Sequence, residues 1–434
     1  MNALPPPTPH EAATTDAAEA FARMARAARA ASRALARAPS AAKDAALRAA
    51  ACSLRARAGE VLAANAADLD AASRDGEAPT DAFRDRLALT PPRVEAMARG
   101  LEEVADLPDP VGRVLAEWTR PNGLVIRRVA QPLGVVGMIY ESRPNVTADA
   151  AALCLKAGSA VVLRGGRESA RSARAVHACL LDGLRAAGLP EAAAQVPPNA
   201  DRAFVAAMLR GAGLLDLLIP RGGKGLVARV LEEARVPVLA HAEGLCHTYL
   251  HTSADAAMAR AVVADAKMRR TGVCGATETL LVDAARAADL LPPVVADLEA
   301  LGCAVRADAR ARAVLPRLAP ASEADFATEW LDAVISVAVV DGVEGALAHI
   351  ARYGSEHTDA IVAEDEGAAR AFLDGLGSAV GLWNASTQFC DGGEFGFGAE
   401  IGIATGRLHA RGPVGVEQLL TYRYQVIGTG QVRG

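Results

Sequence analysis

Apolar residues in the first hundred positions recur with helical spacing. One stripe comprises Phe21, Met24, Ala25 and Ala28, and a second occupies residues 45–62. A helix brings residues three and four positions apart onto one face, so each stripe predicts an amphipathic helix. We therefore expect helices throughout residues 11–105.

The pattern changes to that of a β-hairpin between Glu117 and Val129. Two short strand-like runs, residues 117–120 and 124–129, flank the turn Pro121-Asn122-Gly123. An Asn-Gly pair readily adopts the positive φ angles that a tight hairpin turn requires. A similar strand-like run, residues 420–427, lies near the end of the chain.

Two series of alternating strands and helices follow the hairpin. The first has strands at 134–139, 159–163, 214–219 and 237–240, with helices at 146–156, 168–187, 201–210 and 226–235. The second has strands at 278–282, 333–340 and 360–362, with helices at 254–267, 289–301, 343–350 and 366–373. Short apolar strands joined by helices predict parallel sheets covered on both faces. We expect an α/β fold with a boundary near Gly244 and a glycine-rich, loop-like segment at 384–415.

Length, charge and cysteine content exclude several classes of protein. At 434 residues the chain exceeds one compact core, and at roughly 150 residues per domain it suggests about three. A net charge of −5 argues against a nucleic-acid partner. No apolar run approaches the ~18 residues of a membrane span, and no secretory signal is visible. Seven scattered cysteines without a C-x-x-C pair indicate the reducing cytoplasm.

Two glycine-rich loops follow predicted strands of the first series. Arg164-Gly165-Gly166-Arg167 follows one strand, and Arg221-Gly222-Gly223 joins another strand to a helix. Backbone N–H groups and a helix dipole can bind phosphate there, at the strand ends where open α/β sheets bind ligands. The alternative is that these glycines only make tight turns. Neither G-x-G-x-x-G nor a P-loop motif is present.

Cys274 is the candidate nucleophile. It lies in a loop between a predicted helix and strand, close to Arg269 and Arg270. Basic neighbours and an accessible loop favour a reactive thiolate, although a free cysteine is more often buried and inert. Cys246 and His247 are adjacent on a predicted strand, where neighbouring side chains point to opposite faces.

Three further polar residues are candidate site residues, and structural roles are the alternative interpretation. His357 stands alone in the segment 353–359 and can be a structural imidazole. Arg143 and Asn145 follow the first parallel strand. Asn145 can simply cap the next helix.

Taken together, these motifs resemble the aldehyde dehydrogenase superfamily and, more narrowly, its gamma-glutamyl phosphate reductase (glutamate-5-semialdehyde dehydrogenase) family. The resemblance covers residues 15–430. The stretches that carry it are 132–145, 163–168, 219–223, 246–247, 272–274, 277–282, 354–359, 384–387 and 408–415. Tyr-Glu-Ser-Arg-Pro-Asn at 140–145 and His-Ala-Arg-Gly-Pro-Val-Gly at 409–415 are quite specific to these reductases.

The resemblance implies a reaction and its residues. Cys274 would attack L-glutamyl 5-phosphate, expel phosphate and hold the acyl group as a thioester. Asn145 and the Cys274 backbone N–H would stabilise the oxyanion. NADPH would then reduce the thioester to L-glutamate 5-semialdehyde, the second step of proline biosynthesis from glutamate, with no metal required. A separate glutamate 5-kinase would supply the substrate.

The same resemblance assigns the binding residues. The cofactor residues would be Arg164, Gly165, Arg167, Arg221, Gly222 and Gly223. NAD-preferring relatives often carry an acidic residue at the position of Arg167, so two guanidiniums here favour the 2′-phosphate of NADPH. Arg143, His357 and Arg411 would bind the anionic groups of the substrate. Arg411 can instead form a salt bridge between subunits.

The implied architecture is aldehyde-dehydrogenase-like: two parallel-sheet α/β domains plus a small β oligomerisation arm. Residues 1–244 would bind NADP, with an arm at about 112–131, and 245–385 would carry the nucleophile. Residues 386–434 would return to the cofactor domain and end in an oligomerisation strand. In this superfamily such strands pair across subunits, so we expect a homo-oligomer.

Three departures from the family pattern leave alternatives open. The chain has Gly275 where Asn is common, Gln388 where Arg is common, and Glu243 where small residues are frequent. An acidic residue in that region activates water in hydrolytic relatives, but we interpret Glu243 as structural. The alternatives are a non-phosphorylating aldehyde dehydrogenase, a cysteine hydrolase or acyltransferase that uses His247, and a catalytically silent binding subunit.

Overall fold

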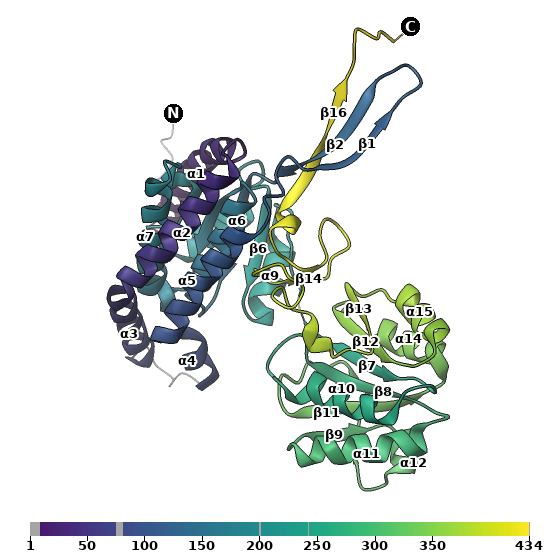
Figure 1. The fold of residues 1–434 in the computed structure, drawn as a ribbon. Coiled ribbons are helices and arrows are strands. Elements are labelled where there is room, and N and C mark those ends of the chain that lie inside the picture. Colours follow the sequence, from purple (N-terminus) through teal and green to yellow (C-terminus); the bar gives the residue numbers. More distant parts are fainter. Residues whose placement is uncertain (1–8, 75–80, 199–200, 242, 434) are drawn as a thin grey trace, which may run out of the picture. The chain divides into compact units, whose positions relative to one another are not determined.

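The computed structural model describes residues 9–74, 81–198, 201–241 and 243–433, and the chain forms two compact units (Figure 1). The first unit comprises Met1–Ala240, Phe397–Gly402 and Val414–Gly434. The second comprises His241–Gly396 and Ile403–Pro413. The division therefore falls at 240/241 rather than the expected 244/245, and 386–396 and 403–413 belong to the second unit.

The first unit begins with five helices, as the apolar stripes predict. They are α1 (Pro9–Leu35), α2 (Ser40–Ala56), α3 (Ala58–Arg74), α4 (Asp81–Leu87) and α5 (Pro91–Asp106). Phe21, Ala25 and Ala28 of the predicted stripe are buried in one cluster with strand residues. Thr90 begins α5, where its side chain accepts a hydrogen bond from the backbone N–H of Arg93. Part of the predicted helical region, residues 75–80, lies outside the described residues.

A parallel four-stranded sheet forms the core of the first unit, in the order β5-β4-β3-β6. Its strands are β3 (Val135–Tyr140), β4 (Ala160–Arg164), β5 (Ala194–Gln195) and β6 (Leu217–Arg221). The helices around it are α6 (Val146–Lys156), α7 (Ala170–Ala186), α8 (Arg202–Leu209) and α9 (Lys224–Glu233), with short 3₁₀ turns η1 (Arg167–Ser169) and η2 (Glu191–Ala193). The sheet winds outward from β3 in both directions, so its switch point lies between β3 and β6, where such sheets bind nucleotides.

The strand predicted at 237–240 is wrong. Only a single bridge forms there, between Leu218 and Val238. The next rung along β6 would need an N–H at position 220, and Pro220 has none, so the pairing does not extend.

A separate antiparallel sheet contains β1 (Val114–Thr119), β2 (Val125–Pro132) and β16 (Leu420–Ile427), in the order β1-β2-β16. Gly123 has a φ of +83°, as the predicted turn between β1 and β2 requires. Figure 1 shows β16 alongside β2, with which it pairs over its full length within the chain. Both edge strands expose large apolar side chains: Val114, Leu115, Trp118, Tyr422, Tyr424, Val426 and Ile427.

The second unit is a seven-stranded sheet in the order β10-β9-β11-β8-β7-β12-β13, parallel throughout. Its strands are β7 (Cys246–Leu250), β8 (Thr277–Asp283), β9 (Ala304–Ala307), β10 (Ala319–Pro320), β11 (Val334–Val340), β12 (Thr358–Val362) and β13 (Val380–Trp383). Its helices are α10 (Ala256–Met268), α11 (Ala287–Ala300), α12 (Ala309–Val314), α13 (Glu323–Phe326), α14 (Gly342–Tyr353) and α15 (Glu366–Gly375).

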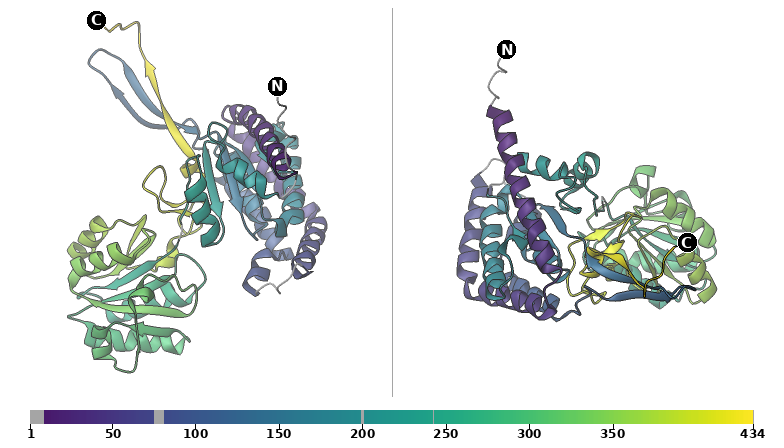
Figure 2. Two further views of the ribbon diagram at one scale, coloured as in Figure 1. Left: turned by 180° about the vertical axis from the view of Figure 1, so that it is seen from behind. Right: turned by 90° about the horizontal axis from the view of Figure 1, so that it is seen from above.

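Helices cover both faces of this sheet, as predicted (Figure 2). Along β8, Leu280 and Val282 pack into one apolar cluster with α10 and α11, whereas Leu281 packs into another with α14 and α15. This alternation follows from the opposite directions of successive side chains on a strand. All residues of β8 and all but the first of β11 are buried, so both faces of these strands are covered.

The glycine-rich segment has little regular structure. It contains the 3₁₀ turn η3 (Thr387–Phe389) and the short antiparallel pair β14 (Ile403–Ala404) and β15 (Gly412–Pro413), and a further turn, η4 (Glu417–Leu419), precedes β16. Among the described residues, none of the helices combines the length and hydropathy that a membrane crossing requires.

Candidate active site

Cys274 lies in the loop that joins α10 to β8 in the second unit. Its side chain is half-buried and packs with Val380, Cys390 and Ile403. The loop turns sharply there, because the backbone N–H of Ala276 donates to the carbonyl of Val273 at 3.0 Å. The thiol thus lies at the carboxyl-terminal end of a helix and directly before a central strand.

The environments of the other six cysteines favour Cys274 as the nucleophile. Cys154, Cys179, Cys246, Cys303 and Cys390 are buried, and Cys52 is exposed on α2. Burial raises the pKa of Cys154 to about 12 and of Cys303 to about 11, and it raises the pKa of Cys246 well above its ordinary value. Since the thiolate is the nucleophile, such thiols are unreactive.

The backbone of Cys274 is held by a close approach of Gly244. A Cβ atom on Gly244 would lie 2.7 Å from both the Cα and the carbonyl carbon of Cys274, and closer still to its oxygen. The N–H of Gly244 also donates to the Glu329 carboxylate at 2.8 Å. Position 244 therefore requires glycine for packing reasons.

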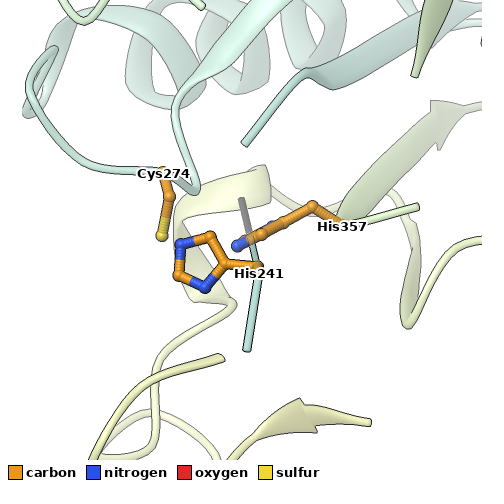
Figure 3. A group of neighbouring side chains, drawn as sticks. All are labelled: His241, Cys274 and His357. Carbon is orange, nitrogen blue, oxygen red and sulfur yellow. The ribbon is translucent and has the colours of Figure 1, made fainter. Parts of the chain in front are cut away.

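Two imidazoles flank the thiol (Figure 3). His241 stands at the start of the second unit, and His357 directly precedes β12. One nitrogen from each ring and the Cys274 sulfur all lie within 4.8 Å of one another. The rings of His241 and His357 pack edge to face, with centroids 5.2 Å apart. His357 is fully buried and His241 is half-buried.

Hydrogen bonds fix the orientation of both rings. Nδ1 of His241 lies 2.7 Å from the carbonyl oxygen of Ile403, an acceptor, so Nδ1 is the donor, and in the neutral ring Nε2 is the nitrogen that can accept a proton. Figure 3 shows the other ring nitrogen of His241 beside the Cys274 sulfur. Nδ1 of His357 lies 2.8 Å from Oγ1 of Thr358 and 3.5 Å from Sγ of Cys246. His241 can thus accept a proton from the thiol.

Sequence reasoning missed His241. It belongs to none of the recognised motifs, and its anchor, Ile403, comes from a distant segment of the chain. A histidine just before the predicted domain boundary was the one available signal.

Gln388, which departs from the family pattern, has a structural role. Its side-chain nitrogen donates to the carbonyls of Asp265 and Ala266 at 3.1 and 3.0 Å. These carbonyls belong to the last turn of α10, where helices leave acceptors unsatisfied. Gln388 therefore anchors the helix end from which the Cys274 loop departs.

A buried ion pair links the two elements on either side of the Cys274 loop. Nζ of Lys267 lies 2.5 Å from the Glu278 carboxylate, and both side chains are at most 1% exposed. Burial raises the pKa of Glu278, while the Lys267 ammonium opposes that rise. The pair joins the end of α10 to β8 on either side of the loop.

Cys246 and His247 do not pair with each other. Sγ of Cys246 donates to the carbonyl oxygen of Cys274 at 3.1 Å, whereas Nδ1 of His247 lies 2.8 Å from the Asp359 carboxylate. Strand neighbours thus take different partners, as predicted. This geometry gives no support to a hydrolase that uses Cys246 with His247.

The chain resembles known proteins over most of its length. The model of the aldehyde dehydrogenase family matches residues 7–315. The chain belongs to the aldehyde dehydrogenase family. It is 71% identical over 407 residues to gamma-glutamyl phosphate reductase of Gluconobacter oxydans, covering 94% of this chain and 95% of that one. It is 65% identical over 420 residues to that of Acidiphilium cryptum, covering 96% and 99%.

A solved structure agrees with these relatives. The crystal structure of gamma-glutamyl phosphate reductase from Thermotoga maritima matches with a TM-score of 0.92 at 40% identity, covering 95% of this chain and 100% of that chain. The predicted aldehyde-dehydrogenase-like α/β fold and the resemblance to these reductases are thereby confirmed.

In this aldehyde dehydrogenase, Asn145 lies in the first unit, at the start of α6. Its side chain makes no capping hydrogen bond, so the capping alternative is wrong. Instead Nδ2 of Asn145 donates to the Asp149 carboxylate at 2.9 Å. Loss of hydration raises the pKa of Asp149 to about 6, and the amide hydrogen bond opposes the rise. The Asn145 amide is thus oriented by a neighbour one helical turn away.

The two arginines of the β4 loop differ in exposure. Arg164 is 9% exposed, and its Nη1 donates to the carbonyl of Gly165 at 2.9 Å. Burial lowers the pKa of Arg164. Arg167 is exposed in η1. A Cβ on Gly165 would lie 2.9 Å from the Tyr140 ring, so this glycine is required by packing.

A carboxylate from the loop after β3 lies at the start of α9. The N–H of Gly223 donates to the Glu141 carboxylate at 3.0 Å, and a Cβ on Gly222 would lie 2.8 Å from the Leu226 side chain. Arg221 lies 4.0 Å from Glu400. An anion therefore already occupies the N-terminus of α9, which shows that this end of the helix accepts negative charge.

The candidate substrate cations fall in different units. Arg143 is half-buried in the loop between β3 and α6 of the first unit. Arg411 lies in the second unit, where its Nη2 donates to the Glu356 carboxylate at 3.0 Å and to the Gly377 carbonyl at 2.8 Å. This ion pair lies within one chain and clamps the segment that precedes His357.

Proposed function

We propose that the chain reduces L-glutamyl 5-phosphate to L-glutamate 5-semialdehyde and phosphate with NADPH, the second step of proline biosynthesis from glutamate. The observation that carries this proposal is the half-buried thiol of Cys274 with an imidazole lone pair beside it. The high identity to relatives named gamma-glutamyl phosphate reductase identifies the acyl phosphate as substrate.

Cys274 opens the acyl phosphate. Nε2 of His241 accepts the thiol proton, and the thiolate attacks the C5 carbonyl. The new C–S bond forms as the bond from carbon to the phosphate oxygen breaks, and phosphate leaves with the electron pair. No metal is required, because the acyl phosphate is already activated. The product on the protein is a glutamyl thioester.

The developing oxyanion receives hydrogen bonds from the Asn145 amide and the Cys274 backbone N–H. Each such donor is typically worth about 3 kcal/mol in the transition state. An amide nitrogen carries two N–H groups, so Asn145 can serve the oxyanion while it donates to Asp149. Asn145 belongs to the first unit and Cys274 to the second.

The residues at the strand ends of the first unit fit a dinucleotide phosphate. Arg164 and Arg167 follow β4, the second strand of the winding, where sheets of this order read the 2′ position of the ribose. The acidic neighbour Glu168 accepts hydrogen bonds from the backbone and hydroxyl of Ser142 at 2.7 and 3.0 Å, so its carboxylate is engaged elsewhere. NADPH, when bound, supplies the hydride that reduces the thioester. Arg221, Gly222 and Gly223 would hold its phosphates.

The cofactor preference gives a direct prediction. Arg167→Glu places a negative charge where the 2′-phosphate binds, so kcat/KM with NADPH should fall about 100-fold relative to that with NADH. The exposed Arg174 on α7 offers a matched control, since Arg174→Glu makes the same charge change beyond the β4 loop. An unchanged ratio of the two cofactors in Arg167→Glu contradicts the assignment.

Arg143, His357 and Arg411 serve the substrate anions in this proposal. Arg411 already donates to Glu356 and two carbonyls, so it contributes mainly by clamping the loop that carries His357. Glu243 remains structural, because an activated water would hydrolyse the thioester and waste the acyl phosphate.

The reverse reaction tests the function. Glutamate semialdehyde and NADP should yield NADPH only when phosphate is added, because phosphate must release the acyl group from Cys274. A non-phosphorylating aldehyde dehydrogenase would ignore added phosphate. Equal rates with and without phosphate would therefore overturn the proposal in favour of that alternative.

The proposed function also includes a cellular location, an oligomeric state and a role for each part of the chain. We propose that the enzyme is cytoplasmic, since none of its seven cysteines, all of which the structure describes, forms a disulfide. It would be a homo-oligomer, because both edges of the sheet β1-β2-β16 expose apolar side chains. The first unit would bind NADP and the second unit, which begins at His241, would carry the nucleophile. Residues 397–402 and 414–434 return to the first unit. A separate glutamate 5-kinase would supply the substrate.

A further inference from the structure

We infer that His241, Cys274 and His357 form a binding site for a zinc ion that reversibly inhibits the enzyme. Their three donor atoms, two imidazole nitrogens and one sulfur, lie within 4.8 Å of one another. They come from three separate segments that the fold brings together, and Figure 3 shows the three side chains next to one another. Zinc binding itself does not depend on the proposed reaction, but inhibition rests on Cys274 being its nucleophile.

The hydrogen bonds around the imidazoles are those of metal ligands. Ligating histidines usually donate their second N–H to a carbonyl or another acceptor, which fixes the tautomer and the ring orientation. Nδ1 of His241 has such an acceptor in the Ile403 carbonyl, at 2.7 Å. Nδ1 of His357 has the Thr358 hydroxyl at 2.8 Å. Both rings can therefore direct Nε2 toward a cation while they keep these Nδ1 contacts.

The donor set selects zinc over the common hard cations. Two imidazoles and one thiolate, with no carboxylate, suit a borderline-soft ion rather than Mg²⁺ or Ca²⁺. Tetrahedral zinc places such ligands about 3.3–3.6 Å apart, so the donors must close by about 1 Å. His241 and Cys274 are half-buried, which leaves them room to move, while His357 is fully buried and fixed. Three protein ligands leave the fourth position to water.

Binding removes the nucleophile. The thiol of Cys274 loses its proton to solvent as the zinc–sulfur bond forms, and no electron is transferred. The sulfur lone pair then lies on the metal and cannot attack the acyl phosphate, while Nε2 of His241 can no longer accept the thiol proton. A chelator reverses the state by removing the ion.

The experiment measures zinc directly, by competition between the reduced, untagged, metal-free protein and a chromophoric chelator. One Zn²⁺ should bind per chain. Removing a mere partner of a metal ligand costs about 10–100-fold in affinity, so Cys274→Ala and His241→Gln should each lose at least about 100-fold. Cys52→Ala, which removes the exposed cysteine of α2, should bind zinc like the parent chain. Co²⁺ should give a thiolate charge-transfer band that Cys274→Ala abolishes.

The outcomes separate this inference from the proposed function. Absence of stoichiometric binding, or binding that neither Cys274→Ala nor His241→Gln weakens, overturns the zinc site, and the phosphate-dependent reaction then stands unaffected. Stoichiometric binding at Cys274 that leaves turnover unchanged overturns inhibition and, with it, the role of Cys274 as nucleophile. Inhibition by Zn²⁺ that a chelator reverses, together with the affinity losses, supports both.

Discussion

Cys274→Ala is expected to lower phosphate-dependent oxidation of glutamate semialdehyde by at least about 10⁴-fold, because no other group can hold the acyl chain as a thioester. The substitution removes one sulfur atom from a half-buried loop position, so the fold should persist. The measurement is kcat with NADP and saturating phosphate, alongside thermal unfolding to show that the variant is folded.

Two other cysteines provide matched controls for that variant. Cys52→Ala makes the same change at an exposed site on α2 and should retain parental turnover. Cys246→Ala removes the hydrogen bond from Sγ to the Cys274 carbonyl but leaves the nucleophile, so it should lose far less activity than Cys274→Ala. Full turnover without the sulfur at position 274 would refute covalent catalysis here.

Most of the fold follows from local apolar patterns. The strands β3, β8 and β11 contain short apolar segments rich in Val, Ile and Leu, and the expected ranges lie within a few residues of the observed ones. The short strands β10 and β13 were missed, since two and four residues give no readable pattern. The segment 237–240 shows the opposite error, because its apolar pattern predicts a strand although Pro220 of the neighbouring β6 cannot donate the hydrogen bond that would extend the pairing.

The candidate site was only partly predictable. A cysteine between a helix and a strand is visible in the sequence, and so are arginines after buried strands. The pairing of His241 with Ile403 and the capping of α10 by Gln388 depend on contacts between distant segments, which no local motif encodes. For the same reason the sequence does not show why each loop position must be glycine. Gly165 is required because the Tyr140 ring packs against it, and nothing in its loop sequence indicates this contact.

Gly244→Ala is the sharpest test of how Cys274 is positioned. The new Cβ would lie 2.7 Å from the Cα and carbonyl carbon of Cys274, and backbone atoms cannot rotate away as a flexible side chain can. The loop must shift, and a displacement of about 1 Å at a catalytic group can cost about 10²-fold in rate. Overpacking of this kind also costs about 1–3 kcal/mol of stability. We expect kcat/KM to fall about 100-fold and the unfolding temperature to drop.

Gly272→Ala is the matched control, because it lies in the same loop and makes the same chemical change. Its added Cβ would have Leu331 as its nearest neighbour, with the carbonyl oxygen 3.9 Å away, an ordinary contact. Activity and unfolding temperature should therefore stay close to those of the parent chain. If the two variants lose activity equally, loop flexibility rather than the close approach of Gly244 controls Cys274. If Gly244→Ala is fully active, the backbone of Cys274 is not held by this contact.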